Sequence, residues 1–166
     1  EDVRALTVIN IAFGLIRDGE VVWDAKDARD GMVSIRKSNP ELKIVLSVGG
    51  WGADGFSQAA RTKEGRERFA ASALAIVKEY GLDGIDIDWE FPGMTFGSNA
   101  YDELVDVENF TLLMKDLRAA LGQSTLLTYA GYCMDKRPQG EGYKYIDVKA
   151  VDPYVDFVNI MAYDLV

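Results

Sequence analysis

Three acidic residues at alternate positions form the pattern with the clearest chemical potential, in the stretch DGIDIDWE at residues 83–90. Successive side chains of an extended strand point to opposite faces, so Asp86, Asp88 and Glu90 should share one face. Carboxylates this close repel one another, and burial of an unpaired charge is costly. Their pKa values should therefore separate, with at least one group protonated near neutral pH. This arrangement suits a general acid oriented by a charged neighbour.

Two other interpretations of the acidic series remain open at this point. A solvent-exposed edge strand would also carry acidic residues on its outer face, but Ile85, Ile87 and Trp89 between the acids favour a buried strand. Clustered carboxylates also suit Mg²⁺ or Ca²⁺. Sensitivity of any hydrolysis to EDTA would support such a metal site. We predict no metal and no cofactor.

Composition excludes several classes of function. The net charge is −9 and the chain has no histidine. Nucleic-acid binding needs a basic surface, and His-based triads and the commonest zinc sites need histidine. No run of about 18 apolar residues is present, so we predict no membrane span. The lone Cys133 allows no internal disulfide and is predicted to pack as a small apolar residue.

Alternation of strand-like and helix-like segments predicts an α/β fold. Apolar, β-branched runs predict strands at 6–14, 43–48, 84–90, 126–132 and 156–163, the first of them buried on both faces. Apolar residues at three- and four-residue steps predict helices at 27–38, 62–80 and 106–121, with a helical turn near 145–151. Such alternation implies right-handed crossovers and a parallel sheet. A flavodoxin-like open sheet would fit the length, but polar residues end three of the strands, where barrel enzymes keep their chemistry.

Three motifs resemble those of family 18 glycoside hydrolases, the chitinases and their relatives. Residues 83–90 resemble the DGxDxDxE signature, SVGGW at 47–51 resembles the SxGG(W) strand, and MAYD at 161–164 resembles the MxYD strand. The resemblance implies a TIM (β/α)8 barrel, a fold of about 250 residues. The chain should then be one partial catalytic domain, 1–166, that holds strands two to six of the barrel and lacks the first and the last two.

The resemblance also implies a mechanism and the residues that perform it. In family 18 the substrate's own 2-acetamido oxygen attacks the anomeric carbon and gives an oxazolinium intermediate. Glu90 matches the general acid and base, and Asp88 matches the residue that hydrogen-bonds the acetamido N–H. Asp86 would share a proton with Asp88, and Tyr163 would donate its hydroxyl to the acetamido carbonyl.

The same resemblance implies further site residues. The positions that match sugar contacts are Phe13, Gly50, Trp51, Met161 and Asp164. Flat sugar faces stack on aromatic rings, so Phe91 is a further candidate contact. Positions that match structural parts of the motifs are Asp83, Gly84, Ser47 and Gly49.

The predicted function is retaining hydrolysis of β-1,4-linked N-acetylglucosamine polymers, either chitin or chitooligosaccharides. A chitinase-like lectin is one alternative, although such lectins typically lose the terminal acid that Glu90 supplies here. An endo-β-N-acetylglucosaminidase acting on N-glycans is another, although Trp89 and the SxGGW strand look more like a chitinase. The missing strands carry aromatic residues of the sugar site, so the segment alone should be weakly active or inactive. We predict chitooligosaccharides as partners and no obligate protein partner. Because the expected substrate is an insoluble extracellular polymer, we expect secretion; no signal peptide is recognisable at the start of the chain, so the signal should lie upstream of Glu1.

Overall fold

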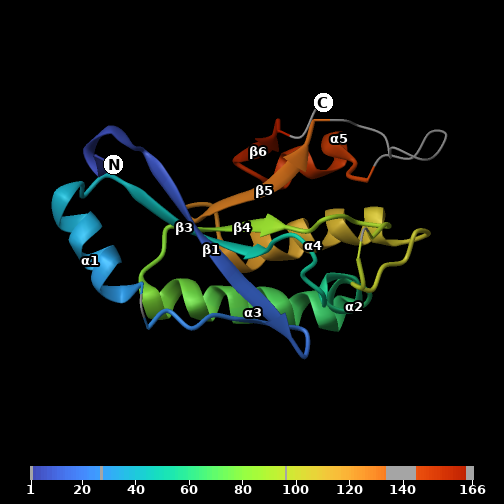
Figure 1. Ribbon diagram of the computed structural model, residues 1–166. Helices are drawn as coiled ribbons and strands as arrows, with labels where there is room; N and C mark the ends of the chain where they lie inside the picture. Colours follow the sequence, from blue (N-terminus) through green and yellow to red (C-terminus); the bar gives the residue numbers. More distant parts are fainter. Residues whose placement is uncertain (1, 27, 96, 134–144, 164–166) are drawn as a thin grey trace.

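The computed structural model describes residues 2–26, 28–95, 97–133 and 145–163, which contain one six-stranded sheet (Figure 1). Its strand order is β2-β1-β3-β4-β5-β6, parallel throughout except for β2, which runs antiparallel to β1. The strands are β1 (Val8–Arg17), β2 (Glu20–Val22), β3 (Lys43–Gly49), β4 (Gly84–Asp88), β5 (Leu126–Tyr132) and β6 (Phe157–Met161).

Three longer helices connect the parallel strands, as the sequence predicts. They are α1 (Arg29–Ser38), α3 (Lys63–Tyr80) and α4 (Asp106–Leu121). The shorter helical segments are α2 (Phe56–Ala60), α5 (Val148–Val151) and two 3₁₀ turns, η1 (Val3–Ala5) and η2 (Asp152–Tyr154). None of the helices within the described ranges is long and apolar enough to cross a lipid bilayer.

Two features were not predicted from the sequence, the β1–β2 hairpin and α2. The hairpin turns at Asp18 and Gly19, whose φ angles are both positive, at 50° and 78°. An Asp-Gly pair is a strong signal for a two-residue hairpin turn, and it allows β1 to run to Arg17 instead of ending near residue 14. The predicted ends of two other strands were also too late, because β4 ends at Asp88 and β6 at Met161.

The prediction that the first strand is buried on both faces is wrong. Most of β1 is exposed or half-buried, whereas every residue of β4 is buried. Pairing with β2 covers only residues 15–17, so the rest of β1 forms an edge of the described sheet. A continuous apolar run therefore indicated a strand correctly but not its burial, which depends on what lies beside it. The prediction that Cys133 packs as a small apolar residue is also wrong, because this residue is exposed just after β5.

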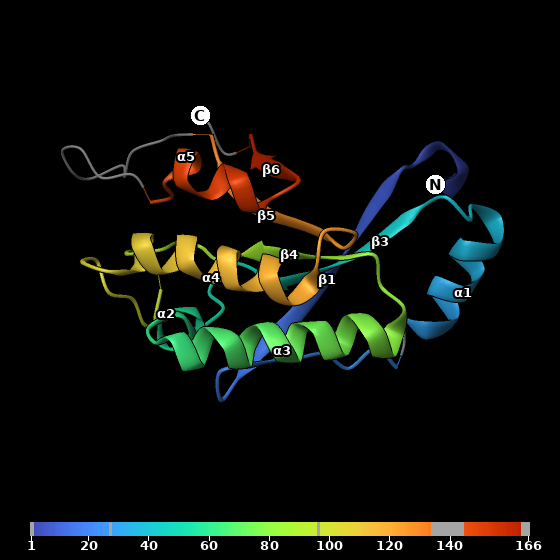
Figure 2. The same ribbon diagram turned by 180° about the vertical axis from the view of Figure 1, so that it is seen from behind.

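The helix-facing side of β4 forms the centre of the core. Trp89 stacks on Phe56 of α2 with ring centroids 5.2 Å apart, and it also packs against Phe110 of α4. Helices α3 and α4 pack against each other on this side of the sheet (Figure 2). Because Ile85 and Ile87 are fully buried with Trp89, the acidic residues between them point to the opposite side.

Aspartates that precede two of the strands fix the ends of the parallel pairs. The Oδ2 atom of Asp83 accepts hydrogen bonds from a β3 backbone N–H at 2.8 Å and from Arg36 at 2.9 Å. Asp156, before β6, repeats this arrangement with a β5 backbone N–H at 2.8 Å and Arg118 at 2.7 Å. Asp83 thus holds the start of β4 against β3, which places the acidic series in register with its neighbours.

Candidate active site

Asp86 lies at the base of the site, held by side chains from three other strands. Its Oδ2 accepts a hydrogen bond from Ser47 at 2.6 Å, and its Oδ1 accepts from Thr128 at 2.6 Å and from Asn159 at 2.9 Å. The residue is only 2% exposed. Three donors satisfy both oxygens of this buried carboxylate. Sequence analysis included Ser47 but missed the other two donors, although each is a polar residue within a largely apolar strand.

Asp88 is the next acidic residue on the same face and is 8% exposed. Burial, the charges of Glu90 and Asp86, and a hydrogen bond with Glu90 raise the pKa of Asp88 to about 7. Its Oδ1 atom is buried without a hydrogen-bond partner among the described residues. The carboxyl group therefore retains its proton up to about pH 7, and its buried Oδ1 has unused hydrogen-bonding capacity.

Glu90 follows the end of β4 and is half-buried. Burial raises the pKa of Glu90, and the hydrogen bond with Asp88 lowers it in part. The resemblance predicted a proton shared between Asp86 and Asp88. In the structure Asp88 hydrogen-bonds Glu90, and Asp86 accepts from three other donors, so a proton shared between Asp86 and Asp88 stays a prediction. The arrangement at the C-terminal end of β4 is thus a coupled Asp88–Glu90 pair above a fixed carboxylate.

Glycines let β3 and β5 approach β4 beside the acids. Gly49 has φ +113°, and a Cβ atom there would lie 2.2 Å from the carbonyl oxygen of Asp88. A Cβ atom at Gly84 would lie 2.5 Å from the carbonyl oxygen of Leu126. The backbone N–H of Gly50 donates to the Asp88 carbonyl at 2.9 Å. Any larger side chain at Gly49 or Gly84 would push the neighbouring strand away from the acidic series.

The predicted sugar-contacting residues fall into an exposed group and a buried group. Trp51 is 69% exposed, and the rings of Phe13 and Tyr163 are also open. The Phe13 ring lies over Gly50, since a Cβ atom added there would be 3.0 Å from it. Such open rings could stack on a sugar.

The buried group contains Phe91 and Met161. Phe91 is 7% exposed and packs against Tyr132 and Tyr145. Direct sugar contact by either buried residue stays a prediction. Asp164 lies outside the described residues.

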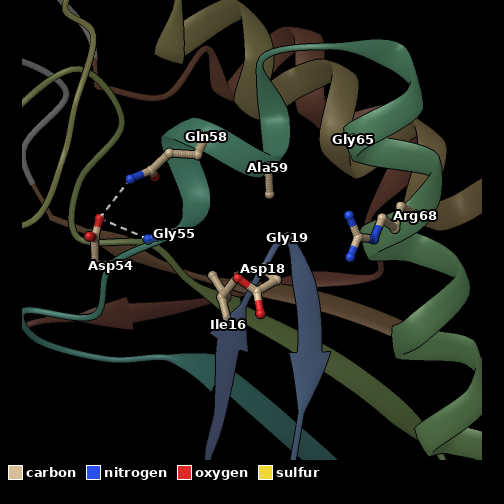
Figure 3. Close-up of a pocket in the computed structure, with 9 residues that line it drawn as sticks. All are labelled: Ile16, Asp18, Gly19, Asp54, Gly55, Gln58, Ala59, Gly65 and Arg68. Carbon is tan, nitrogen blue, oxygen red and sulfur yellow. Dashed lines mark hydrogen bonds between the residues drawn. The ribbon is translucent and has the colours of Figure 1, made fainter.

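Other places on the chain offer less for such chemistry. Within the described ranges, no group of three His, Cys, Asp or Glu side chains is arranged to hold a metal ion. A pocket of about 460 Å³ lies between the β1–β2 hairpin and the α2–α3 corner (Figure 3). Its lining residues are Ile16, Asp18, Gly19, Asp54, Gly55, Gln58, Ala59, Gly65 and Arg68. This lining contains no aromatic ring and none of the acidic series, so we place the chemistry at Asp86, Asp88 and Glu90.

Carboxyl groups of raised pKa at the C-terminal end of a parallel β/α sheet are typical of (β/α)8-barrel enzymes that use acid–base chemistry. The sequence model of the family described as glycosyl hydrolases family 18 matches residues 2–166, so the chain belongs to that family. The six-stranded sheet is accordingly part of a TIM barrel, as predicted.

Individual relatives agree with this assignment. Mouse chitotriosidase-1 is 37% identical over 140 residues, which are 79% of this chain and 28% of the relative. A family 18 N-acetylglucosaminidase from Paenibacillus barengoltzii is 38% identical with a TM-score of 0.87, over 98% of this chain and 48% of its own. A mutant family 18 chitinase from Cycas revoluta, solved in complex with (GlcNAc)4, is 28% identical with a TM-score of 0.83, over 100% of this chain and 50% of its own. The chain thus spans about half of these solved relatives and less of the curated one.

Proposed function

We propose that the protein containing this chain hydrolyses β-1,4-linked N-acetylglucosamine polymers with retention at the anomeric carbon. The observation that carries the proposal is the coupled Asp88–Glu90 pair, which holds a proton near neutral pH beside an unpaired buried oxygen. Family membership and relatives that include a chitotriosidase and a chitinase solved with (GlcNAc)4 support this class of substrate. Since chitin is an insoluble polymer outside the cell, we also propose that the complete protein is secreted.

Glu90 acts first as the general acid in the proposed mechanism. Its raised pKa and its hydrogen bond with Asp88 let Glu90 take over the proton that the pair holds, in the half-buried position where β4 ends. It gives that proton to the glycosidic oxygen as the bond from this oxygen to the anomeric carbon breaks. In the second step Glu90 takes a proton from the water that attacks the anomeric carbon, which restores the acid.

The substrate itself supplies the nucleophile, so no second carboxylate has to attack. The acetamido carbonyl oxygen bonds to the anomeric carbon from the face opposite the leaving group, and water later displaces it. The Oδ1 atom of Asp88, which has no partner among the described residues, accepts the acetamido N–H. Tyr163 donates its hydroxyl to the acetamido carbonyl. Asp88 also stabilises the positive oxazolinium, above the Asp86 carboxylate that three hydrogen bonds hold in place.

The test is the complete protein beside its Glu90→Gln variant, assayed on N-acetylchitooligosaccharides. We expect the wild type to hydrolyse the substrate with retention, which NMR detects as the anomer of the first product. In the variant kcat should fall by at least about a hundredfold. Glu41→Gln is the matched control, because Glu41 is exposed in the turn before β3, at the opposite end of the strands. Equal rates in Glu90→Gln and the wild type would contradict the assignment of the acid.

A binding protein is the alternative that this experiment separates. If the complete protein binds the oligosaccharides but does not cleave them, the lectin hypothesis replaces hydrolysis and Glu90 becomes a contact residue. The products also separate the enzyme alternatives. Release of monomers, of dimers, or of glycans from an N-glycoprotein would identify an N-acetylglucosaminidase, a chitinase or an endo-β-N-acetylglucosaminidase respectively.

A further inference from the structure

Tyr132 occupies a position in the site that sequence analysis did not identify. It is the last residue of β5 and pairs with Met161 at the end of β6. Side chains alternate along β5, and Thr128 faces inward because its hydroxyl donates to Asp86. Tyr132, four residues further, therefore lies on the same face of the sheet as the acidic series, at its C-terminal end. The residue is half-buried.

Neighbouring aromatic residues hold Tyr132 in place, and one of them directly follows the proposed acid in the sequence. Its ring centroid is 6.2 Å from that of Phe91, the residue that follows Glu90. The hydroxyl of Tyr145 donates to the carbonyl oxygen of Tyr132 at 2.5 Å, and the Tyr145 ring meets Phe91 edge-on with centroids 5.3 Å apart. Burial raises the pKa of Tyr145 to about 12, so this hydroxyl keeps the proton that it donates. Three rings from β5, the Glu90–Phe91 segment and the segment before α5 thus pack together.

The three rings differ in exposure, and Tyr132 is the most exposed of them. Phe91 and Tyr145 are buried and support the cluster, whereas Tyr132 is half-buried at the end of an inward-facing row. A tyrosine ring offers a sugar an apolar face and a polar edge. A fixed ring loses little conformational freedom when a ligand packs on it.

We propose that Tyr132 is a substrate-contacting residue that forms the β5-side wall for the N-acetylhexosamine ring bound beside Glu90. This inference rests on the proposed function and adds a specificity-determining residue to it. A flat aromatic wall favours a pyranose that presents its apolar face to β5, and it contributes to binding in both the ground state and the transition state.

Binding of the N-acetylglucosamine tetramer by calorimetry tests the proposal directly. All proteins compared carry Glu90→Gln, which suppresses turnover. One is otherwise unchanged, and the others also carry Tyr132→Ala or Tyr132→Leu. We expect the Kd to rise on the order of fivefold in both, because leucine keeps apolar bulk but not the flat ring. Tyr80→Leu is the matched control, since this half-buried ring packs on Trp23 at the far end of α3, and its Kd should stay within about twofold.

Kinetics with Glu90 intact separate substrate contact from a structural role. Loss of a contact made equally in the ground state and the transition state raises KM and leaves kcat nearly unchanged. Displacement of the Glu90 carboxyl group would instead lower kcat. An unchanged Kd in both Tyr132 variants, with the wild type still hydrolysing the tetramer, would overturn the inference and leave the proposed function intact. A wild type that neither binds nor cleaves the tetramer would overturn both. Should circular dichroism show that Tyr132→Ala is unfolded, the leucine variant decides.

Discussion

Replacement of Asp88 by asparagine should change how the stability of the complete protein depends on pH. The pKa of Asp88 is raised from its ordinary 3.8 to about 7 in the folded state. Between these values the folded state keeps a proton that the unfolded state has released, so wild-type stability falls as pH rises through this window. The stabilising contribution is complete below pH 3.8 and is lost above about pH 7. An asparagine side chain does not titrate, so the variant should escape this loss.

The size of the effect follows from the two pKa values. They differ by about three pH units, and each unit corresponds to about 1.4 kcal/mol, which gives an upper bound of about 4 kcal/mol. Glu90 shares the hydrogen bond with Asp88, and water reaches the half-buried Glu90 side chain, so we expect about half of this upper bound. Relative to wild type, Asp88→Asn should therefore gain about 2 kcal/mol between pH 4 and pH 8.

Urea unfolding of both proteins at pH 4, 6 and 8 measures this difference. The free energies of unfolding are compared at each pH, after a check that the m-values agree. Asp30→Asn, an exposed substitution in the first turn of α1, is the matched control and should shift stability by less than about 0.5 kcal/mol at every pH. Parallel pH curves for wild type and Asp88→Asn would refute the reasoning, because they would mean that Asp88 is ionised in the folded protein.

Further predictions concern the backbone, the base of the sheet and the pH–rate profile. Gly49→Ala should cost about 3 kcal/mol or more by urea unfolding, because its Cβ would lie 2.2 Å from the Asp88 carbonyl oxygen, whereas Gly19→Ala, with open space around it, should cost about 1 kcal/mol. Arg118→Met should cost about 3 kcal/mol, since this buried guanidinium donates to Asp156 and to three backbone carbonyls. Arg4→Met, in an exposed pair, should leave the urea midpoint unchanged. Because burial raises the pKa of Glu90, the alkaline fall of kcat/KM for oligosaccharides should lie above pH 4.5, and a fall centred at or below 4.5 would contradict its role as the acid.

Local residue patterns were sufficient to predict most of the architecture. Alternate apolar and acidic residues place Asp86 and Asp88 on one face of a strand because the strand period is two. Apolar residues at helical spacing predicted α3 and α4, and Gly81 and Gly122 end these helices. The Asp-Gly pair at residues 18 and 19 carried the signal for the β1–β2 hairpin, although sequence analysis predicted no strand after it.

How the acids differ from one another depends on the folded chain. A pKa depends on burial and on charged or hydrogen-bonding neighbours, and these come from distant parts of the sequence. Thr128 and Asn159 reach Asp86 from 42 and 73 residues away, whereas the hydrogen bond of Asp88 is with Glu90. Tyr132 joins the site for the same reason, through its strand pairing with Met161 and its contact with Phe91. Residue spacing shows which side chains share a face, whereas the pairing of strands in the sheet brings particular ones into contact.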